Sequence, residues 1–137
     1  VVVAQVLVVT PIAISLLTGV FSMVPREMEE SAVVYGAGWR EVLTMVILPL
    51  STPGLISAWG ISFFRALGEF GATLILAGNI PGYTETLPLA LYNAISLADV
   101  ERASVIYTVI LVVGLSAVVM HALVQRSMIK SPAILRV

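Results

Sequence analysis

The sequence contains no cysteine and few charged side chains. Only 11% of its 137 residues are charged, compared with about 25% in soluble globular domains. Without cysteine, disulfides and thiolate metal sites are excluded. With one histidine, one aspartate and no GxSxG or HExxH motif, the chain lacks the groups that an intramembrane hydrolase needs. A net charge of −1 without a basic patch gives no sign of nucleic-acid binding. We therefore expect no enzymatic activity, no metal site and no nucleic-acid partner.

Apolar residues dominate the chain. They make up 59% of the sequence, and the mean hydropathy is +1.06. Three apolar segments, residues 1–23, 53–77 and 103–124, are each long enough to cross the roughly 30 Å hydrocarbon core as a helix. Gly68 and Gly71 predict a break near residues 68–71 in the second segment. We expect an all-α, polytopic membrane protein with three transmembrane helices. Because the chain starts inside an apolar run, we also expect an N-terminal part to precede it.

The charged segment, residues 25–49, separates the first two apolar segments. Acidic residues follow its initial proline and favour the positive end of a helix dipole. Gly36 predicts a stop and a turn, and a second amphipathic helix is predicted to end at Pro49. Thr52 and Pro53 then predict the cap and first turn of the next span. We expect two short helices that are too polar to span a membrane.

The other connecting segments, residues 78–102 and 125–137, complete the predicted topology. Residues 78–102 combine a Pro-Gly turn with an apolar run too short to span, and Asp99 is placed to cap the last helix. Basic residues lie mainly in the charged segment and the tail, whereas residues 78–102 contain only Arg102. The positive-inside rule then places the charged segment and the C-terminus in the cytoplasm. We expect residues 78–102 to form an extracytoplasmic loop with a short helix, and His121 to anchor the inner end of the last span.

Part of the charged segment resembles the EAA loop of ABC-importer permeases. The resemblance is carried by Glu30-Ser31-Ala32, Gly36 and Ile47-Leu48-Pro49, at the spacing found in that family. Two residues depart from the pattern. Ser31 stands in place of the first alanine, and Val33 stands where many members carry arginine. Serine is small enough for the same close packing.

A second set of residues indicates which subfamily of these permeases the chain resembles. The stretches FRALGEFGAT (residues 64–73), AGNIPG (77–82) and TLPLALY (86–92) are similar to the molybdate permease subfamily, with sulfate and tungstate permeases as close relatives. The resemblance implies the C-terminal part of a single permease domain. Its implied function is ATP-driven import of an oxyanion by alternating access, with molybdate as the favoured cargo. Sulfate, thiosulfate and tungstate stay open as cargoes, and a non-transporting membrane scaffold is the alternative of a different class.

The resemblance also implies partners and site residues. The partners are cytoplasmic ATPase subunits, an extracytoplasmic substrate-binding protein, a second permease copy and the bilayer of a prokaryotic cytoplasmic membrane. ATP would be used by the ATPase, because this chain has no GxxxxGK[ST] phosphate loop and is expected to bind no cofactor itself. Trp39, Val42 and Val46 are expected to be buried against the permease's own spans. Coupling to the ATPase is expected of Glu30, Ser31, Ala32, Gly36, Trp39, Ile47, Leu48 and Pro49. Contact with the binding protein is expected of Asn79, Pro81 and Gly82.

The resemblance finally suggests a translocation path or gate at Arg65, Gly68, Glu69, Phe70 and Gly71. Arg65 and Glu69 are ionisable residues within an apolar segment, which makes them functional candidates. On one interpretation, Arg65 lends positive potential to an oxyanion route. On the other, the two side chains, four residues apart, satisfy each other or polar groups of other spans and hold the bend at the glycines.

Overall fold

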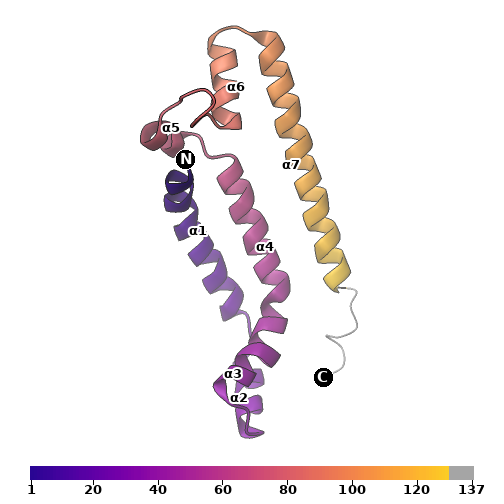
Figure 1. Ribbon diagram of the computed structural model, residues 1–137. Coiled ribbons are helices and arrows are strands. Elements are labelled where there is room, and N and C mark those ends of the chain that lie inside the picture. Colours follow the sequence, from indigo (N-terminus) through magenta and orange to yellow (C-terminus); the bar gives the residue numbers. More distant parts are fainter. Residues whose placement is uncertain (130–137) are drawn as a thin grey trace. The chain divides into compact units, whose positions relative to one another are not determined.

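The computed structural model describes residues 1–129, and Figure 1 shows their helices. All regular elements in that range are helices, which confirms the all-α prediction. In chain order they are α1 (Val2–Ser22), α2 (Arg26–Val34), α3 (Trp39–Glu41), the π-helical segment η1 (Val42–Ile47), α4 (Leu48–Leu67), α5 (Gly71–Ala77), α6 (Leu87–Ser96) and α7 (Val100–Ile129). The chain forms two compact units. One consists of Val1–Ile12 with Ser62–Met120, and the other of Ala13–Ile61 with the segment that follows from His121.

Three helical stretches are long and apolar enough to cross a membrane: Val2–Ser22, Trp39–Leu67 and Val100–Arg126. Their apolar side chains are largely exposed, and no residue in the most apolar part of the third stretch is buried within the described chain. Hydrocarbon solvates such a surface, and the backbone hydrogen bonds of a helix are satisfied internally there. The helix α6 is apolar but too short to span. The architecture is therefore that of a multi-pass membrane protein.

Small residues on α4 hold the unit that contains Ala13–Ile61. Gly54 lies so close to α1 that a Cβ atom at residue 54 would be 2.7 Å from a methyl carbon of Val20. On α7, the side-chain amide of Gln125 donates a hydrogen bond to Ser57 Oγ. Glycine and serine at helix contacts let neighbouring backbones approach closely, which is how helices associate in a membrane.

The other unit is held together around α5 and α6. Leu89 of α6 is fully buried. The rings of Phe70 and Tyr92 meet edge to face with their centroids 5.3 Å apart, a favourable arrangement for two aromatic quadrupoles. Near the start of α1, Gln5 Nε2 donates a 3.2 Å hydrogen bond to the Ala66 carbonyl in the last turn of α4. The end of α4 is thus tied to α1 by a polar contact.

The second helix of the charged segment does not end at Pro49, so that prediction is wrong. Helical structure continues from Trp39 to Leu67 and passes through η1, which ends two residues before Pro49. In a regular α-helix the proline ring clashes with a carbonyl of the preceding turn. The wider π-helical turn, with hydrogen bonds to the carbonyl five residues back, gives that ring room. The second half of the charged segment and the second span are consequently one continuous helix.

Thr52 and Pro53 do not start a new helix either. The helix is already formed at this point, so Thr52 Oγ1 donates a 2.7 Å hydrogen bond back to the Leu48 carbonyl instead of capping free amides. The span predicted at residues 53–77 is divided between α4 and α5. Residues 68–70, which separate the two helices, lie where the sequence predicts a break.

The last helix is longer than the predicted range of 103–124. It begins at Val100 because Asp99 Oδ1 accepts a 3.0 Å hydrogen bond from the Arg102 amide, the contact made by an N-cap residue. It continues to Ile129, so residues 125–129 extend the helix and do not belong to a separate tail. The rest of the predicted tail, with Lys130 and Arg136, lies outside the described residues.

Candidate functional site

The charged segment begins with α2, whose residues are almost all exposed. The helix ends in a Schellman motif around Gly36. The Gly36 amide donates to the Val33 carbonyl at 2.9 Å, and the Ala37 amide donates to the Ala32 carbonyl at 3.0 Å. Gly36 has φ +88°, which glycine adopts without a steric penalty from Cβ. The chain therefore reverses its direction at Gly36 because of the residues of the turn itself. The next helix, α3, begins at Trp39.

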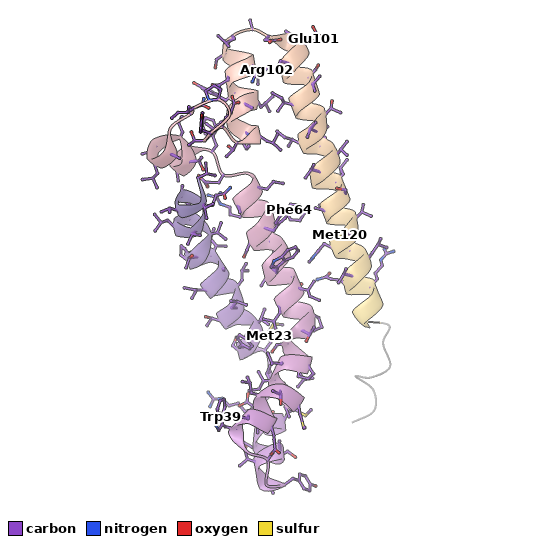
Figure 2. All side chains as sticks on the ribbon, viewed as in Figure 1. Met23, Trp39, Phe64, Glu101, Arg102 and Met120 are labelled. Carbon is purple, nitrogen blue, oxygen red and sulfur yellow. The ribbon has the colours of Figure 1, made fainter. Side chains whose placement is uncertain are left out.

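The start of α3 is fixed by a carboxylate. Glu41 Oε2 accepts a 2.8 Å hydrogen bond from the Gly38 amide, which satisfies an amide that has no helical partner. The Arg40 guanidinium lies over the Trp39 ring at 5.5 Å from its centroid. Within the described residues Trp39 is 72% exposed and Val42 is buried, and burial of Trp39 against further spans of the permease stays a prediction. Figure 2 shows the Trp39 side chain directed away from the ribbon.

Exposed apolar side chains gather at the turn between α2 and α3. Tyr35 is 90% exposed, and Val33, Val34 and Trp39 are also largely exposed. No functional role is predicted for Val34 or Tyr35 from the sequence. The signal that marks them is an apolar run at the end of a helix that is otherwise polar. Such a cluster in a charged element is typical of a surface that a partner protein or a membrane covers.

A groove of about 480 Å³ opens beside α2. Glu29, Glu30 and Arg26 supply charges of both signs to it. Its full lining is Phe21, Ser22, Val24, Arg26, Glu29 and Glu30. Of the predicted coupling residues, Glu30 therefore lines a groove. Gly36 forms the turn, Ser31 and Ala32 lie on α2, and Ile47, Leu48 and Pro49 lie within the continuous helix.

An ion pair occupies the break between α4 and α5. Arg65 Nη1 donates a 2.6 Å hydrogen bond to Glu69 Oε2. The other carboxylate oxygen of Glu69 accepts a 2.9 Å hydrogen bond from the Ala72 amide in the first turn of α5. The structure thus brings together the two ionisable residues of the predicted path. Their geometry agrees with the interpretation in which they satisfy each other and hold the bend.

Gly68, close to the ion pair in sequence, lies in an apolar environment. Gly68 lies at an apolar cavity of about 170 Å³. The remaining lining residues, none of them charged, are Phe64, Leu67, Leu87, Pro88, Ile110, Val113 and Gly114. Phe70, also predicted for the path, packs on Tyr92. Of the predicted path residues, only the ion pair therefore presents charge.

A chain of hydrogen bonds orders the loop before α6. Asn79 Nδ2 donates to Asn93 Oδ1 at 2.6 Å, and Asn93 Nδ2 donates to Glu85 Oε1 at 2.9 Å. Arg102 Nη2 lies 3.8 Å from the other oxygen of Glu85. Arg102 is labelled at the start of α7 in Figure 2. The Asn79 side chain is therefore hydrogen-bonded to another residue of the chain, a contact that the sequence did not predict.

The turn that follows Asn79 is exposed. The Tyr83 amide donates a 3.1 Å hydrogen bond to the Ile80 carbonyl across Pro81 and Gly82. Gly82 has φ +79°, as the third residue of a type II turn requires. Pro81 and Gly82 are both exposed. They offer an exposed surface beside the more buried Asn79.

The helices and the charged elements between them define a multi-pass helical membrane protein. Three stretches of the described chain are able to span it. Residues 1–130 match the family of binding-protein-dependent transport system inner membrane components, and the chain belongs to this family.

Two relatives illustrate the similarity. The chain is 41% identical over 78 residues to the molybdenum transport system permease protein ModB of Escherichia coli (strain K12), which covers 57% of this chain and 34% of ModB. It is 40% identical over 89 residues to the sulfate transport system permease protein CysT of Salmonella typhimurium, which covers 65% of this chain and 32% of CysT. The matched stretches span about a third of the length of these relatives. No solved structure shows a significant match to the chain.

Proposed function

We propose that the chain is part of a permease subunit that imports a tetrahedral oxyanion across the cytoplasmic membrane by alternating access. Membership of the binding-protein-dependent transport family supports transport. Relatives named for molybdenum and for sulfate transport support an oxyanion cargo. Molybdate is the first candidate because the stretches at residues 64–73 and 77–82 resemble the molybdate subfamily.

The observation that carries this proposal is the continuous helix from Trp39 to Leu67. Its first turn lies in the charged segment beside the exposed apolar cluster, and its remainder is apolar enough to span the membrane. No flexible loop separates the two parts. A partner that moves the charged segment would therefore also move the part of the second span up to Ile61, which belongs to the same compact unit, and movement of helix ends is the kind of transition that switches access.

The partner at the charged segment is a cytoplasmic ATPase subunit. Glu30 presents a carboxylate in the groove for a basic group, and Tyr35 and Trp39 supply apolar area that water would otherwise cover. Because Arg26 and Arg40 belong to this segment, the positive-inside rule places it in the cytoplasm together with the C-terminus. In this proposal the partner subunit binds and hydrolyses ATP.

Further partners complete the proposed importer. An extracytoplasmic binding protein would deliver the oxyanion to the exposed turn at Pro81 and Gly82. A second permease copy would form the other half of the path, and it would cover part of the apolar surface of α7. Arg65 would contribute positive potential to the path, with Glu69 as its resting partner.

The test is uptake into vesicles that contain the full-length subunit, its ATPase and its binding protein. Radiolabelled molybdate, tungstate and sulfate are compared in parallel, with and without ATP. We expect ATP-dependent uptake with molybdate preferred. A strong preference for sulfate would overturn the choice of cargo. Stable copurification with the ATPase but no uptake of any of the three would favour a scaffold role.

A further inference from the structure

The two members of the Arg65–Glu69 ion pair are held very differently. The Glu69 side chain is 5% exposed, and its second oxygen is bound by the Ala72 amide. The Arg65 side chain is 42% exposed. Within residues 1–129, the bond to Glu69 is the one hydrogen bond that its guanidinium makes. The carboxylate is therefore fixed in place, whereas the guanidinium is a long side chain attached at a single point.

A guanidinium has capacity for a second anion. It carries five N–H donors in a planar fork that matches carboxylate, sulfate and similar oxyanions. The break that holds the pair is not crowded at Gly71, where an added Cβ atom would meet nothing within 4 Å. The Arg65 side chain itself is 42% exposed, so its remaining N–H donors are accessible to an incoming ion.

We propose that Arg65 is an oxyanion-exchange residue that leaves Glu69 for a doubly charged tetrahedral oxyanion and returns to Glu69 when the oxyanion departs. This inference rests on the proposed transport function and adds a role for the carboxylate. Glu69 is the fixed internal competitor, and Arg65 is the mobile partner. The exchange breaks one charge-assisted hydrogen bond and forms another, with no covalent step.

Electrostatics explains why a transport path needs the competitor. Attraction between a cation and a dianion grows as the local dielectric falls, so an unpaired guanidinium near a membrane span would retain its ion. With Glu69 held nearby by the Ala72 amide, departure of the oxyanion leaves a paired guanidinium. A transport site must bind strongly enough to accept the ion and weakly enough to release it.

The test measures binding and release separately on the permease–ATPase complex in nanodiscs, without binding protein. Radiolabelled molybdate and sulfate are the probes. Glu69→Gln removes the charge but keeps an oxygen that accepts from Ala72. We expect this variant to bind the oxyanion at least about fivefold more tightly than the wild type, the lower end of typical coupling between sites. In the complete importer, its uptake rate at saturating loaded binding protein should fall by a similar factor.

Two further variants identify the partner of the oxyanion. Arg65→Gln combined with Glu69→Gln should abolish the gain in affinity, because the guanidinium is gone. Glu101→Gln is the matched control, since it removes an exposed carboxylate of the same unit. The exchange is wrong if Glu69→Gln binds no more tightly than the wild type, or if the double variant binds as tightly as Glu69→Gln.

A measurement on the wild-type complex covers the case in which a variant fails to fold. Phenylglyoxal modifies exposed arginines, and peptide mass spectrometry reads Arg65 and Arg102 separately. Molybdate should slow modification of Arg65 and leave Arg102 unchanged. Equal rates with and without the oxyanion would overturn the exchange. If wild-type vesicles transport molybdate while both tests fail, the exchange is wrong and the transport function stands; absence of all uptake instead overturns the transport function.

Discussion

The imidazole ring of His121 on α7 lies directly against Gly60 of α4. A Cβ atom at residue 60 would be 2.8 Å from His121 Nδ1 and 2.9 Å from Cε1, closer than Cβ atoms approach non-bonded atoms. Gly60 is buried by this contact. One α-helical turn further along α7, Gln125 bonds Ser57 of α4. The lone histidine is thus part of a helix contact, in addition to its predicted place near the end of a span.

Gly60→Ala should weaken the contact between α4 and α7. The added methyl group must displace the ring, and overpacking of this kind costs about 1–3 kcal/mol. Thermal melting of the purified full-length subunit in detergent measures the loss. Gly114→Ala is the control, because a Cβ atom there meets nothing within 4 Å and alanine favours a helix. Adding His121→Ala to Gly60→Ala should restore part of the stability. An unchanged melting temperature for Gly60→Ala would contradict the packing.

Gly36→Ala should destabilise the turn between α2 and α3. At φ +88° an alanine costs roughly 1–2 kcal/mol. The Ala37 amide, which bonds the Ala32 carbonyl, should then exchange its hydrogen faster with solvent. Gly38→Ala is the matched control, since the nearest atom to its added Cβ is 3.9 Å away and its φ is −73°. Equal exchange rates in the two variants would show that the turn does not depend on Gly36.

Ala98→Gly should stabilise the turn between α6 and α7. Ala98 is the only residue other than glycine with positive φ in the described chain, at 54°. Its amide bonds the Ile95 carbonyl at 3.0 Å, so the backbone is held in a conformation that favours glycine. We expect a gain of about 1 kcal/mol, read as a higher melting temperature. Ala90→Gly, within α6, should instead cost about 1 kcal/mol. A loss of stability in Ala98→Gly would contradict the strain argument.

Glu30→Lys should abolish association with the ATPase and ATP-driven uptake. The substitution places a positive charge in the groove beside α2, where a basic group of the partner is expected. Copurification of the ATPase and uptake in vesicles are the two readouts. Glu27→Lys is the control, because it makes the same charge change on the same exposed helix outside the groove. If both variants retained association and uptake, Glu30 would have no role in coupling.

Several local features follow from the sequence alone because neighbouring residues determine them. The number of membrane-spanning stretches depends on the length and apolar character of each run. The stop at Gly36, the turn at Pro81 and Gly82 and the cap at Asp99 depend on one or two residues and their backbone preferences. The break at residues 68–70 lies beside Gly68 and Gly71, where the sequence predicts it.

Other features were decided only by the tertiary structure. Proline normally ends a helix, yet the π-helical turn before Pro49 joins the charged segment to the second span as one helix. The exposure of Trp39 and the bond between Asn79 and Asn93 depend on which surfaces meet. The sequence also left open two interpretations of Arg65 and Glu69. Spacing permits the pair, but only the fold reveals that the carboxylate is buried and anchored while the guanidinium is half-exposed, because burial depends on residues far away in the chain.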